Sequence, residues 1–318
     1  MNLKYSFFSR LFLLAICVMV VTATGCSRAE AVTSSKKIWQ PDSAVSVTGE
    51  EAAVPETESG LYSKAPAPAV LAAQKQSPDE ARLSAAITAF KAIPHPAEYQ
   101  AEIDAICRKI SASPALFISD IKAVDAADTE GYLVYIDKTH FIGADYEPAD
   151  LVPLVKNSAY PINRNDLSLR KPVEEALTVM ANAAKAEGLS LLVSSTYRSY
   201  SYQEQVFAKW VRIDGLEEAE RESARAGTSQ HQLGTAIDFG SIEDDYAETA
   251  PCKWLTKHAA EYGFSLSFPQ GYEPITGFRW ECWHFRYIGV PACELQKAWF
   301  NDIQQYMIEF VACWRDAK

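Results

Sequence analysis

Hydrophobic and polar positions recur along most of the chain with the periods of regular secondary structure. The stretch "SPDEARLSAAITAFKAI" predicts a helix from Ser77 onward. Serine is a good N-cap, proline suits the first helical position, and Asp79 and Glu80 favour the positive end of a helix. A second helix is expected from about residue 96 to 110, where apolar residues recur at helical spacing and form one stripe.

The rest of the chain predicts a mixture of strands and helices. "GYLVYI" opens a loop-rich segment with a strand pattern, "LSLLVSSTY" is a buried strand, and "GFRWECWHFRYIG" is an aromatic strand. Further helices are expected at 172–187 (closed by Gly188), 200–211, 252–264 and, as one C-terminal helix, 291–313. The elements do not alternate with Rossmann regularity, so the predicted class is α+β, a small, mainly antiparallel sheet flanked by helices.

The N-terminal residues have the pattern of a signal peptide. Lys4 and Arg10 precede an apolar run at 11–21, which small residues follow. The run is short for a membrane span, which makes a retained transmembrane helix the weaker reading. The small residues end in "ATGC", which resembles a bacterial lipobox and implies lipidation of Cys26. Simple secretion is the alternative, because Ala23 stands where leucine is most common. Either reading places the protein outside the cytoplasm, on the outer side of the membrane or in the periplasm.

The composition changes along the chain and suggests five segments. Residues 26–76 are rich in Ala, Pro and Ser and show no sustained period, so they cannot bury enough apolar surface to fold and predict a flexible tether. The expected organisation is a signal peptide at 1–25, the tether at 26–76, a helical N-terminal extension at 77–130, a main domain at 131–292 and a C-terminal helix at 293–318.

Charge and cysteine content narrow the classes of function. The formal net charge of −11 over 318 residues, without clustered Lys and Arg, gives no sign of a nucleic-acid partner. Five cysteines follow Cys26 along the chain, an odd number without CxxC spacing. One or two disulfides could form among them, but the spacing is not that of a zinc finger.

The stretch "SQHQLGTAIDFG" carries the first candidate chemistry. His231 and Asp238 are separated by Gly234, which lets the chain turn. Asp238 stands in an apolar, strand-like stretch, where an ionised carboxylate is costly unless something positive compensates it. A zinc ion or a nearby arginine would do so.

Glu281 and His284 in "WECWHF" could complete a catalytic metal site. His231, Asp238 and His284 would supply three N/O ligands and leave a fourth position for water. Glu281 would then be free to act as base on that water. Strand positions three apart face opposite sides of a sheet, so Glu281 must lie at a strand entrance or bulge to reach the same site.

Arg198 follows a buried strand, on the loop that leads into a helix. Its guanidinium could bind a substrate carboxylate as a fork or stabilise an oxyanion. The simpler alternative is a partner for one of the many surface acids. Trp280 and Trp283 could stack on substrate or fill the core, with Trp283 the better candidate for a pocket wall.

Together, "YRSYSYQ", "SQHQLGTAID" and "WECWHFRYIG" resemble the VanY-type D-alanyl-D-alanine carboxypeptidases, zinc peptidases of bacterial cell walls. The central family motif S-x-H-x-x-G-x-A-x-D and the later motif E-x-W-H are both matched. The resemblance covers about residues 131–291, and "DYEPADLV" looks like another family segment. The departure is Cys282, where many relatives have proline, and it bears on how Glu281 is aimed.

The resemblance implies a role for each matched position. It implies that Zn²⁺ is held by His231, Asp238 and His284. Glu281 corresponds to the catalytic base and Arg198 to the arginine that contacts the substrate or its transition state. Gln203 and Ser229 match positions that line the same pocket. Together with Arg198 and Trp283, they are the expected substrate-binding residues.

The function that the resemblance implies is a zinc-dependent D-alanyl-D-alanine carboxypeptidase, which removes the terminal D-Ala from peptidoglycan stem peptides. One alternative is a zinc D,D-dipeptidase or peptidoglycan endopeptidase of the same family. Another is a non-catalytic wall-binding lipoprotein. The expected partners are a stem peptide and, through a lipid on Cys26, the membrane.

Overall fold

The computed structural model describes residues 76–317 of the chain. The predicted signal peptide, the Cys26 lipidation site and all but the last residue of the predicted tether lie outside these residues. The first described helix, α1 (Pro78–Ala92), begins as the sequence predicts. Ser77 accepts a hydrogen bond from the backbone of Glu80, whose side chain accepts one from the backbone of Ser77. This reciprocal capping box satisfies backbone donors that the first turn would otherwise leave unpaired.

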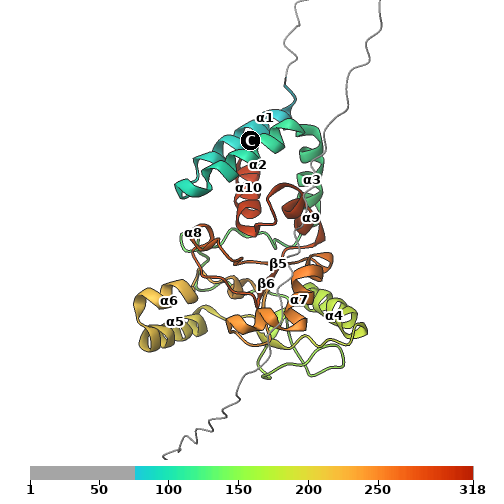
Figure 1. Cartoon of the computed structure of the whole chain (residues 1–318), viewed down its shortest axis with the longest axis vertical. Helices are drawn as coiled ribbons and strands as arrows, with labels where there is room; N and C mark the ends of the chain where they lie inside the picture. The colour runs from blue at the N-terminus through green and yellow to red at the C-terminus, as the bar shows by residue number, and fades with distance from the viewer. Residues whose placement is uncertain (1–75, 318) are drawn as a thin grey trace, which may run out of the picture. The chain divides into compact units, whose positions relative to one another are not determined.

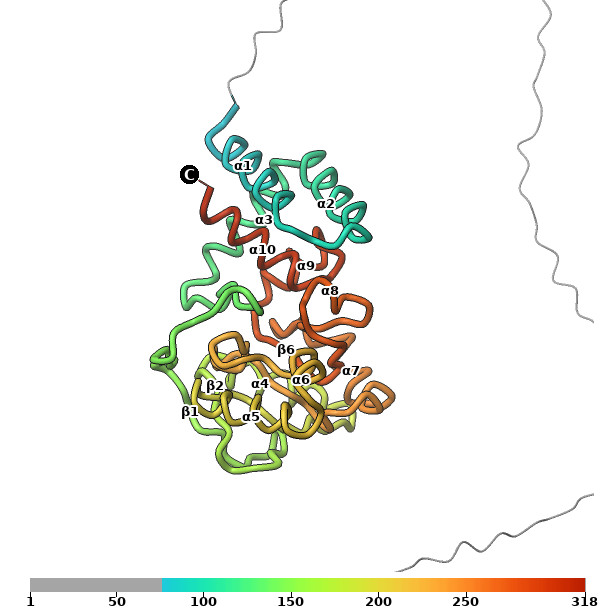
Figure 2. Tube along the Cα trace, turned by 90° about the vertical axis from the view of Figure 1, so that its left-hand side faces the viewer, coloured from blue at the N-terminus to red at the C-terminus, as the bar shows by residue number. Residues whose placement is uncertain are grey.

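Five helices pack together at one end of the folded structure (Figures 1 and 2). They come from both ends of the sequence: α1, α2 (Gln100–Ala112), α3 (Pro114–Ala127), α9 (Val290–Trp299) and α10 (Gln304–Asp316). A short 3-10 turn at Ala97–Tyr99 precedes α2, close to the predicted start of that helix. Helix α3 is an additional helix, which the sequence pattern did not predict separately.

The expectation of one C-terminal helix at 291–313 is wrong, because the chain breaks between α9 and α10. Asn301 and Asp302 have φ values of 52° and 63°, the left-handed conformation that stops a right-handed helix. The break lets α10 turn back and lie beside α1, where Nε of Arg82 donates to the backbone carbonyl of Trp314 at 2.8 Å.

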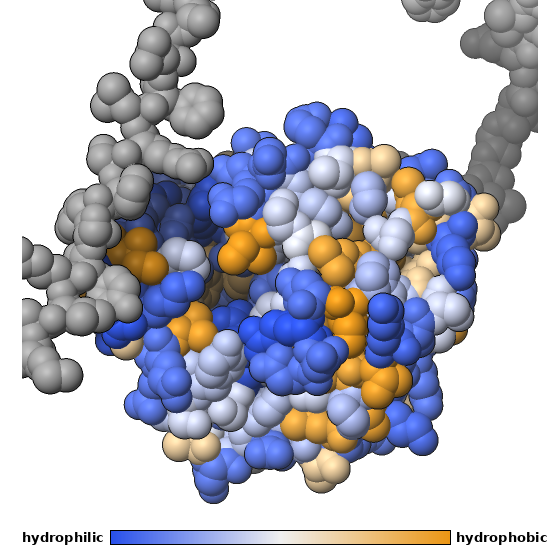
Figure 3. All heavy atoms as spheres, turned by 90° about the horizontal axis from the view of Figure 1, so that it is seen from below, coloured by the Kyte–Doolittle hydropathy of each residue, from blue (hydrophilic) through white to orange (hydrophobic). Residues whose placement is uncertain are grey.

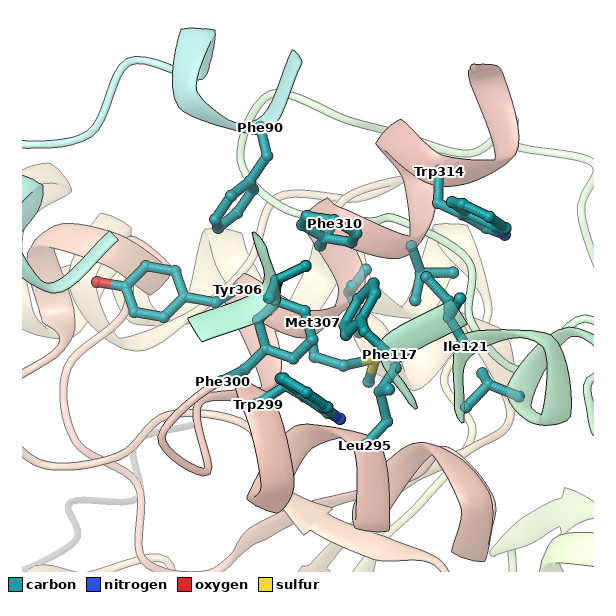
Figure 4. Close-up of a cluster of buried hydrophobic side chains, with 14 of the residues drawn as sticks. Phe90, Phe117, Ile121, Leu295, Trp299, Phe300, Tyr306, Met307, Phe310 and Trp314 are labelled. Atoms are coloured by element: carbon teal, nitrogen blue, oxygen red, sulfur yellow. The ribbon is translucent and has the colours of Figure 1, made fainter. Parts of the chain in front are cut away.

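Aromatic side chains fill the core of this helical unit (Figure 4). The ring of Phe310 contacts those of Phe90 and Phe117 edge to face, with centroids 5.4 and 5.1 Å apart. All three side chains are fully buried. They join α1, α3 and α10, so the N-terminal extension and the C-terminal helices share one core.

Truncating the central ring of that core will destabilise the protein. We expect Phe310→Ala to lower the free energy of unfolding by about 3–5 kcal/mol, because it removes a buried ring and leaves a cavity. Denaturant titration of the full chain measures the change. Phe141→Ala is the matched control, since that ring is 78% exposed and should change stability little. Equal effects of the two substitutions would contradict this account of the core.

Two small sheets confirm the predicted α+β class. A four-stranded antiparallel sheet has the order β3-β4-β6-β5, and β1 pairs with β2 in a second sheet. The bounds are β1 Leu151–Pro153, β2 Ser168–Arg170, β3 Val193–Ser195, β4 Ala236–Phe239, β5 Phe264–Leu266 and β6 His284–Tyr287. Of the expected aromatic strand at 277–289, only residues 284–287, in its second half, form a strand.

The remaining helices surround the four-stranded sheet (Figure 1). They are α4 (Lys171–Ala186), α5 (Tyr200–Asp214), α6 (Leu216–Glu222), α7 (Ala250–His258) and α8 (Glu273–Thr276), with short 3-10 helices at Gln230–Leu233, Asp244–Glu248 and Ala259–Tyr262. Within residues 76–317, none of the helices has the length and apolar content that a membrane crossing needs. The face seen from below carries hydrophobic side chains in small groups among hydrophilic ones (Figure 3).

The two faces of the four-stranded sheet differ in chemistry because side chains alternate along each strand. Ile237, Phe285 and Phe264 belong to a buried apolar cluster with residues of α4 and α7. On the opposite face, Asp238 pairs with His284, and Arg286 lies between Ala236 and Ser265. The second face is thus polar and buried, and one end of it carries two of the predicted metal ligands.

The strand expected at the start of "GYLVYI" does not form. Residues 131–136 run as turns and extended loop, although Leu133 and Ile136 are buried as a strand pattern would predict. Nη2 of the buried Arg286 donates to the backbone carbonyls of Tyr132 and Val134 at 2.7 and 2.8 Å. An arginine side chain thus satisfies carbonyls that a neighbouring strand would otherwise bind.

Candidate active site

All eight predicted site residues line one cavity of about 690 Å³. They are Arg198, Gln203, Ser229, His231, Asp238, Glu281, Trp283 and His284. Helix α5 lines one side of the cavity, and β4, β6 and the residues before them line the other. Segments that are up to 86 residues apart in sequence (198–284) therefore meet at one place.

His231 lies on the 3-10 helix at Gln230–Leu233. The hydroxyl of Ser229 caps this helix by accepting a hydrogen bond from the backbone N–H of His231 at 3.3 Å. The turn ends at Gly234 with φ of 67°. A Cβ there would come within 3.0 Å of side-chain carbons of Arg170 and Leu151, so glycine suits both the conformation and the space. Strand β4 begins two residues after Gly234.

Asp238 and His284 are brought together by strand pairing. They are register partners on β4 and β6, and His284 Nδ1 lies 2.9 Å from Asp238 Oδ1. His231 approaches from the turn, with Nε2 3.2 Å from Asp238 Oδ2. One ligand atom from each of the three residues lies within 4.8 Å of the others. Among residues 76–317, this is the one group of His, Cys, Asp or Glu side chains so arranged.

The outer nitrogens of both imidazoles face carbonyl oxygens, which fixes the tautomers. His231 Nδ1 lies 2.6 Å from the backbone carbonyl of Thr196, and His284 Nε2 lies 3.1 Å from Oε1 of Gln230. A carbonyl oxygen only accepts, so each of these nitrogens carries the hydrogen. The inner nitrogens, His231 Nε2 and His284 Nδ1, then point lone pairs at Asp238. This is the support that metal-binding histidines commonly have.

The inner atoms of this cluster need a cation. Burial, together with the charge of Arg198, lowers the pKa of His231 to about 4, so the ring is neutral at neutral pH. Asp238 is buried as well, and an ionised carboxylate there needs a compensating positive charge. The buried His231 Nε2 has no hydrogen-bond partner among the described residues. Two lone pairs facing a buried carboxylate fit a metal ion placed between them.

Glu281 lies before β6 rather than in it, as the three-residue spacing requires. The chain turns here, and the backbone N–H of His284 donates to the carbonyl of Glu281 at 3.1 Å. The carboxylate bends back to the cluster, with Oε2 3.7 Å from His284 Nδ1. Burial and the nearby charge of Asp238 raise the pKa of Glu281 well above its usual value. A buried carboxyl with a raised pKa beside the cluster is suited to take up and release a proton.

Arg198 is held over the same cluster. Its Nη2 lies 3.8 Å from Asp238 Oδ2, and its Nη1 donates to Oε1 of Gln203 at 2.9 Å. The Gln203 amide also donates to the carbonyl of Ala224 at 2.6 Å, so in this structure Gln203 orients the arginine. Arg198 Nε is buried and has no partner within residues 76–317. One donor of this guanidinium is therefore left without a partner inside the protein.

Trp283 and Cys282 have different surroundings. Trp283 lines the cavity and also packs in the apolar cluster of the sheet, so it is both a wall of the cavity and a core residue. The Cys282 sulfur faces the backbone carbonyls of Glu243 and Asp244 and is not part of the metal-competent group. The five cysteines in the described part of the chain are free thiols: Cys107, Cys252, Cys282, Cys293 and Cys313.

Thr196 and Gln230 were not expected as partners of the imidazoles. Thr196 lies in the strand pattern "LSLLVSSTY" and Gln230 in the motif "SQHQLGTAID", but the spacing gives no sign of where either residue points. Gln230 lies 54 positions before His284 and reaches it only through the fold. Thr196 contributes a backbone carbonyl, which any residue type could supply.

Comparison with known proteins agrees with this site. The sequence model of the VanY family, described as D-alanyl-D-alanine carboxypeptidase, matches residues 166–290. YodJ of Bacillus subtilis (strain 168), named as a candidate carboxypeptidase, is 34% identical over 189 residues, which cover 56% of this chain and 69% of that protein. The bifunctional D-Ala-D-Ala dipeptidase and carboxypeptidase VanXYC of Enterococcus gallinarum is 29% identical over 56% of this chain and 96% of its own.

At least one protein of known structure has a fold similar to that of this chain. The LdcB LD-carboxypeptidase superposes with a TM-score of 0.50 at 31% identity, over 56% of this chain and 86% of the other. The stretch matched by the family model contains all eight site residues, whereas α1–α3 and most of α9 and α10 lie outside it. The chain therefore belongs to the VanY D-alanyl-D-alanine carboxypeptidase family and is a metallo-carboxypeptidase whose candidate zinc site is the buried cluster of His231, Asp238 and His284.

Proposed function

We propose that this protein is a zinc-dependent D,D-carboxypeptidase that removes the terminal D-alanine from peptidoglycan stem peptides. The observation that carries the proposal is the convergence of a metal-competent cluster, a buried carboxyl and an unpaired arginine donor on one cavity. We infer the class of substrate from the activities for which the relatives are named. Proteins of Enterococcus faecium and Enterococcus gallinarum named for cleavage at D-Ala-D-Ala are 27% and 29% identical to this chain.

Zinc suits the donor set, two imidazole nitrogens and a carboxylate oxygen, which leaves a fourth position open. When bound, zinc would polarise the scissile carbonyl and make water acidic enough to attack near neutral pH. The residues of this chain supply the other parts of the reaction.

Glu281 moves the proton in this proposal. Its carboxylate accepts a proton from the attacking water and returns it to the nitrogen of the departing D-alanine. A base and acid of this kind works best when its pKa lies near the working pH, and the burial of Glu281 raises its pKa in that direction.

Arg198 contributes positive charge on the substrate side of the cavity. Its free Nε–H can donate to the oxyanion or to the terminal carboxylate, while Gln203 and Asp238 keep the guanidinium in place. Charge-assisted hydrogen bonds of this kind are strongest in a buried site.

Replacing Arg198 with lysine tests this role. We expect Arg198→Lys to lower kcat/KM about 100-fold, because lysine keeps the charge but loses the fork and the bond to Gln203. Zinc content should stay at the wild-type level. Steady-state kinetics and metal analysis of the same samples measure both. Arg315→Lys, far from the cavity on α10, is the control. Wild-type kinetics in Arg198→Lys would show that only the charge matters.

The size of the cavity favours a carboxypeptidase over a dipeptidase. About 690 Å³ exceeds what two alanine residues fill, and the cavity extends along α5 past Val206 and Trp210. A dipeptidase would need walls that close around both ends of its substrate. The open cavity has room for the part of a stem peptide that precedes the cleaved bond.

Cleavage of an L,D bond is a second candidate. The LdcB LD-carboxypeptidase is the solved relative with a TM-score of 0.50. The carboxylates of Asp214, Glu222 and Glu243 also line the cavity, where they could face an amine on the penultimate residue of the substrate. A pentapeptide ending in D-Ala-D-Ala and the corresponding tetrapeptide distinguish the two specificities.

The test incubates the purified protein with four substrates, and mass spectrometry follows each with zinc or with a chelator. The substrates are the stem pentapeptide, the stem tetrapeptide, free D-Ala-D-Ala and cross-linked muropeptides. Loss of one alanine from the pentapeptide, abolished by the chelator and restored by zinc, supports the proposal. Cleavage of the tetrapeptide alone indicates the L,D enzyme, and cleavage of free D-Ala-D-Ala alone a dipeptidase. Cleavage of cross-links indicates an endopeptidase, and retention without cleavage a wall-binding protein.

We also propose that the enzyme is exported and anchored by a lipid on Cys26. The support is the signal-peptide pattern of residues 1–25 and the lipobox-like "ATGC". An anchored domain outside the cytoplasmic membrane would meet stem peptides there. Membrane fractionation of wild type and Cys26→Ser tests the anchor: release of the variant supports it, and equal membrane retention contradicts it.

A further inference from the structure

We propose that Gln305, near the start of α10, is a specificity-determining residue that accepts a hydrogen bond from an N–H group of the stem peptide upstream of the cleaved bond. The inference rests on the proposed function and adds a binding residue to it. Helix α10 lies outside residues 166–290, the stretch that matches the family. The helical unit would therefore supply a part of the substrate site that this stretch does not contain.

The cavity of the candidate active site reaches the helical unit. Gln305 lines it, together with Ile136 and Asp137 from the loop between α3 and β1. Helix α10 lies between α1 and the four-stranded sheet (Figures 1 and 2). The first turn of α10 therefore forms part of a cavity wall that also carries the candidate metal ligands.

Two aromatic rings separate this part of the wall from the metal cluster. The ring of Phe268 lies 4.7 Å from the imidazole of His284 and 5.0 Å from the ring of Phe278, centroid to centroid. Beyond Phe278 lies Nζ of Lys138, 4.9 Å from the ring centroid, and Lys138 is next in sequence to Asp137. A single departing alanine spans only about 3.5 Å. A group that reaches α10 therefore belongs to the longer part of the substrate.

The amide of Gln305 is held in one orientation by two acidic side chains. Its Nε2 donates to Oδ2 of Asp137 at 3.3 Å and to Oε1 of Glu309 at 3.0 Å. The other oxygen of Glu309 lies 2.8 Å from Nε2 of His95, in the segment between α1 and α2. An ionised carboxylate accepts hydrogen bonds but cannot donate them. A reversed amide would place the Gln305 oxygen against two acceptors, so the nitrogen must face them.

Asp137 is itself fixed by the loop that carries it. Its Oδ1 accepts from the backbone N–H groups of Thr139 and His140 at 2.7 and 2.8 Å. Burial alone would raise the pKa of Asp137, but hydrogen bonds from these two residues hold that pKa below its usual value. The carboxylate is therefore ionised at neutral pH, and its second oxygen is available to Gln305.

The amide oxygen is the polar atom that Gln305 can offer to a substrate. Within residues 76–317 it has no hydrogen-bond partner, and it is not one of the buried atoms left unpaired. The residue is 8% exposed and borders the cavity, so we place this oxygen at the cavity surface. An amide oxygen only accepts. The donors that a stem peptide offers upstream of the cleaved bond are backbone N–H groups and a side-chain amine.

The test measures kcat and KM of the purified full chain with a pentapeptide that has lysine at its third position. Gln305→Met keeps the length of the side chain and removes both polar groups. Gln305→Lys keeps a donor for Asp137 and Glu309 but has no acceptor. We expect KM to rise about tenfold in both variants, the loss of roughly one hydrogen bond. The kcat should stay within about twofold of wild type, because this bond is made before and during the reaction alike.

Two further substrates identify the donor. In an acetylated D-Ala-D-Ala dipeptide the upstream residues are missing, so the variants should have the same KM as wild type. A pentapeptide with norleucine in place of lysine lacks the side-chain amine. If the amine is the donor, the wild-type KM for this peptide rises to that of the variants. If a backbone N–H is the donor, wild type keeps its KM and the variants still show the tenfold increase.

Matched substitutions on another helix separate this role from a structural one. Gln205→Met and Gln205→Lys change an exposed glutamine of α5 that does not line the cavity, and should keep the wild-type KM. Unfolding midpoints show whether each variant is folded. Folded Gln305 variants whose KM is that of wild type, or rises equally for the pentapeptide and the dipeptide, would overturn the inference and leave the proposed function standing. A wild-type protein that removes no D-alanine from the pentapeptide would overturn both.

Discussion

Replacing Glu281 with glutamine will remove nearly all hydrolysis and leave the metal site occupied. Glutamine has the same shape as glutamate but cannot accept a proton from water, so we expect kcat to fall about 10³-fold, within the range for general acid–base groups. The carboxylate lies 3.7 Å from His284 Nδ1 and is not one of the three clustered ligands. The zinc content of the variant should therefore equal that of wild type. Mass spectrometry of pentapeptide cleavage and metal analysis measure the two quantities.

The control for this variant makes the same chemical change at a distance. Glu174→Gln on α4 alters a partly buried carboxylate that accepts from Tyr160 at 2.7 Å, outside the cavity. It should leave kcat unchanged. Full activity of Glu281→Gln would remove Glu281 from the mechanism. Loss of zinc together with activity would mean that Glu281 helps to hold the metal.

Asp238→Asn is expected to abolish stable zinc binding, and activity with it. Asp238 is the one anion among the three clustered ligands, and it lies close to Arg198. A neutral side chain there leaves the arginine as uncompensated positive charge beside an incoming cation. We expect the Kd for zinc to rise at least about 100-fold, because a ligand itself is lost rather than a group that supports one.

Thermal unfolding gives an independent readout of that loss. Zinc at 100 times its Kd stabilises a native protein by about 2.7 kcal/mol, so the wild-type melting temperature should rise when zinc is added. Asp238→Asn should show no rise at the same concentration. Asp125→Asn, which alters an acid that binds Trp314 and Arg315 on α10, is the control and should keep the wild-type rise. An unchanged zinc response in Asp238→Asn would rule the residue out as a ligand.

The residues of the site could be predicted because short segments encode most of their geometry. The span from His231 to Asp238 is one turn and the start of a strand, with Gly234 as the turning point. The span from Glu281 to His284 is a turn that leads into β6. The pairing of β4 with β6 then places Asp238 opposite His284. Both segments match family motifs. The resemblance therefore indicated that they share a site, although the pairing register of β4 and β6 could not be seen in the sequence.

The parts that could not be predicted depend on contacts between distant segments. The "GYLVYI" pattern predicts a strand, yet two of its backbone carbonyls bind the side chain of Arg286, 152 and 154 positions further on. The break at Asn301 and Asp302 lies in a stretch whose apolar spacing favours one continuous helix. It is held by Gln296, and sequence periodicity carries no sign of that bond. The contact of Gln230 with His284 is equally non-local.

The helical unit is discontinuous in sequence, and this has a consequence for how the protein unfolds. Its core combines residues of α1–α3 with residues of α9 and α10, and it also includes Leu133 and Ile288, at the two ends of the segment that carries the cavity. In topology, that segment is a long insertion between α3 and α9, and the helical unit holds its two ends close together. Once the helices are packed, the segment loses less conformational entropy on folding, because its ends have already been brought together. Melting of the helices would release both ends at once, so the two parts should unfold as a single cooperative unit.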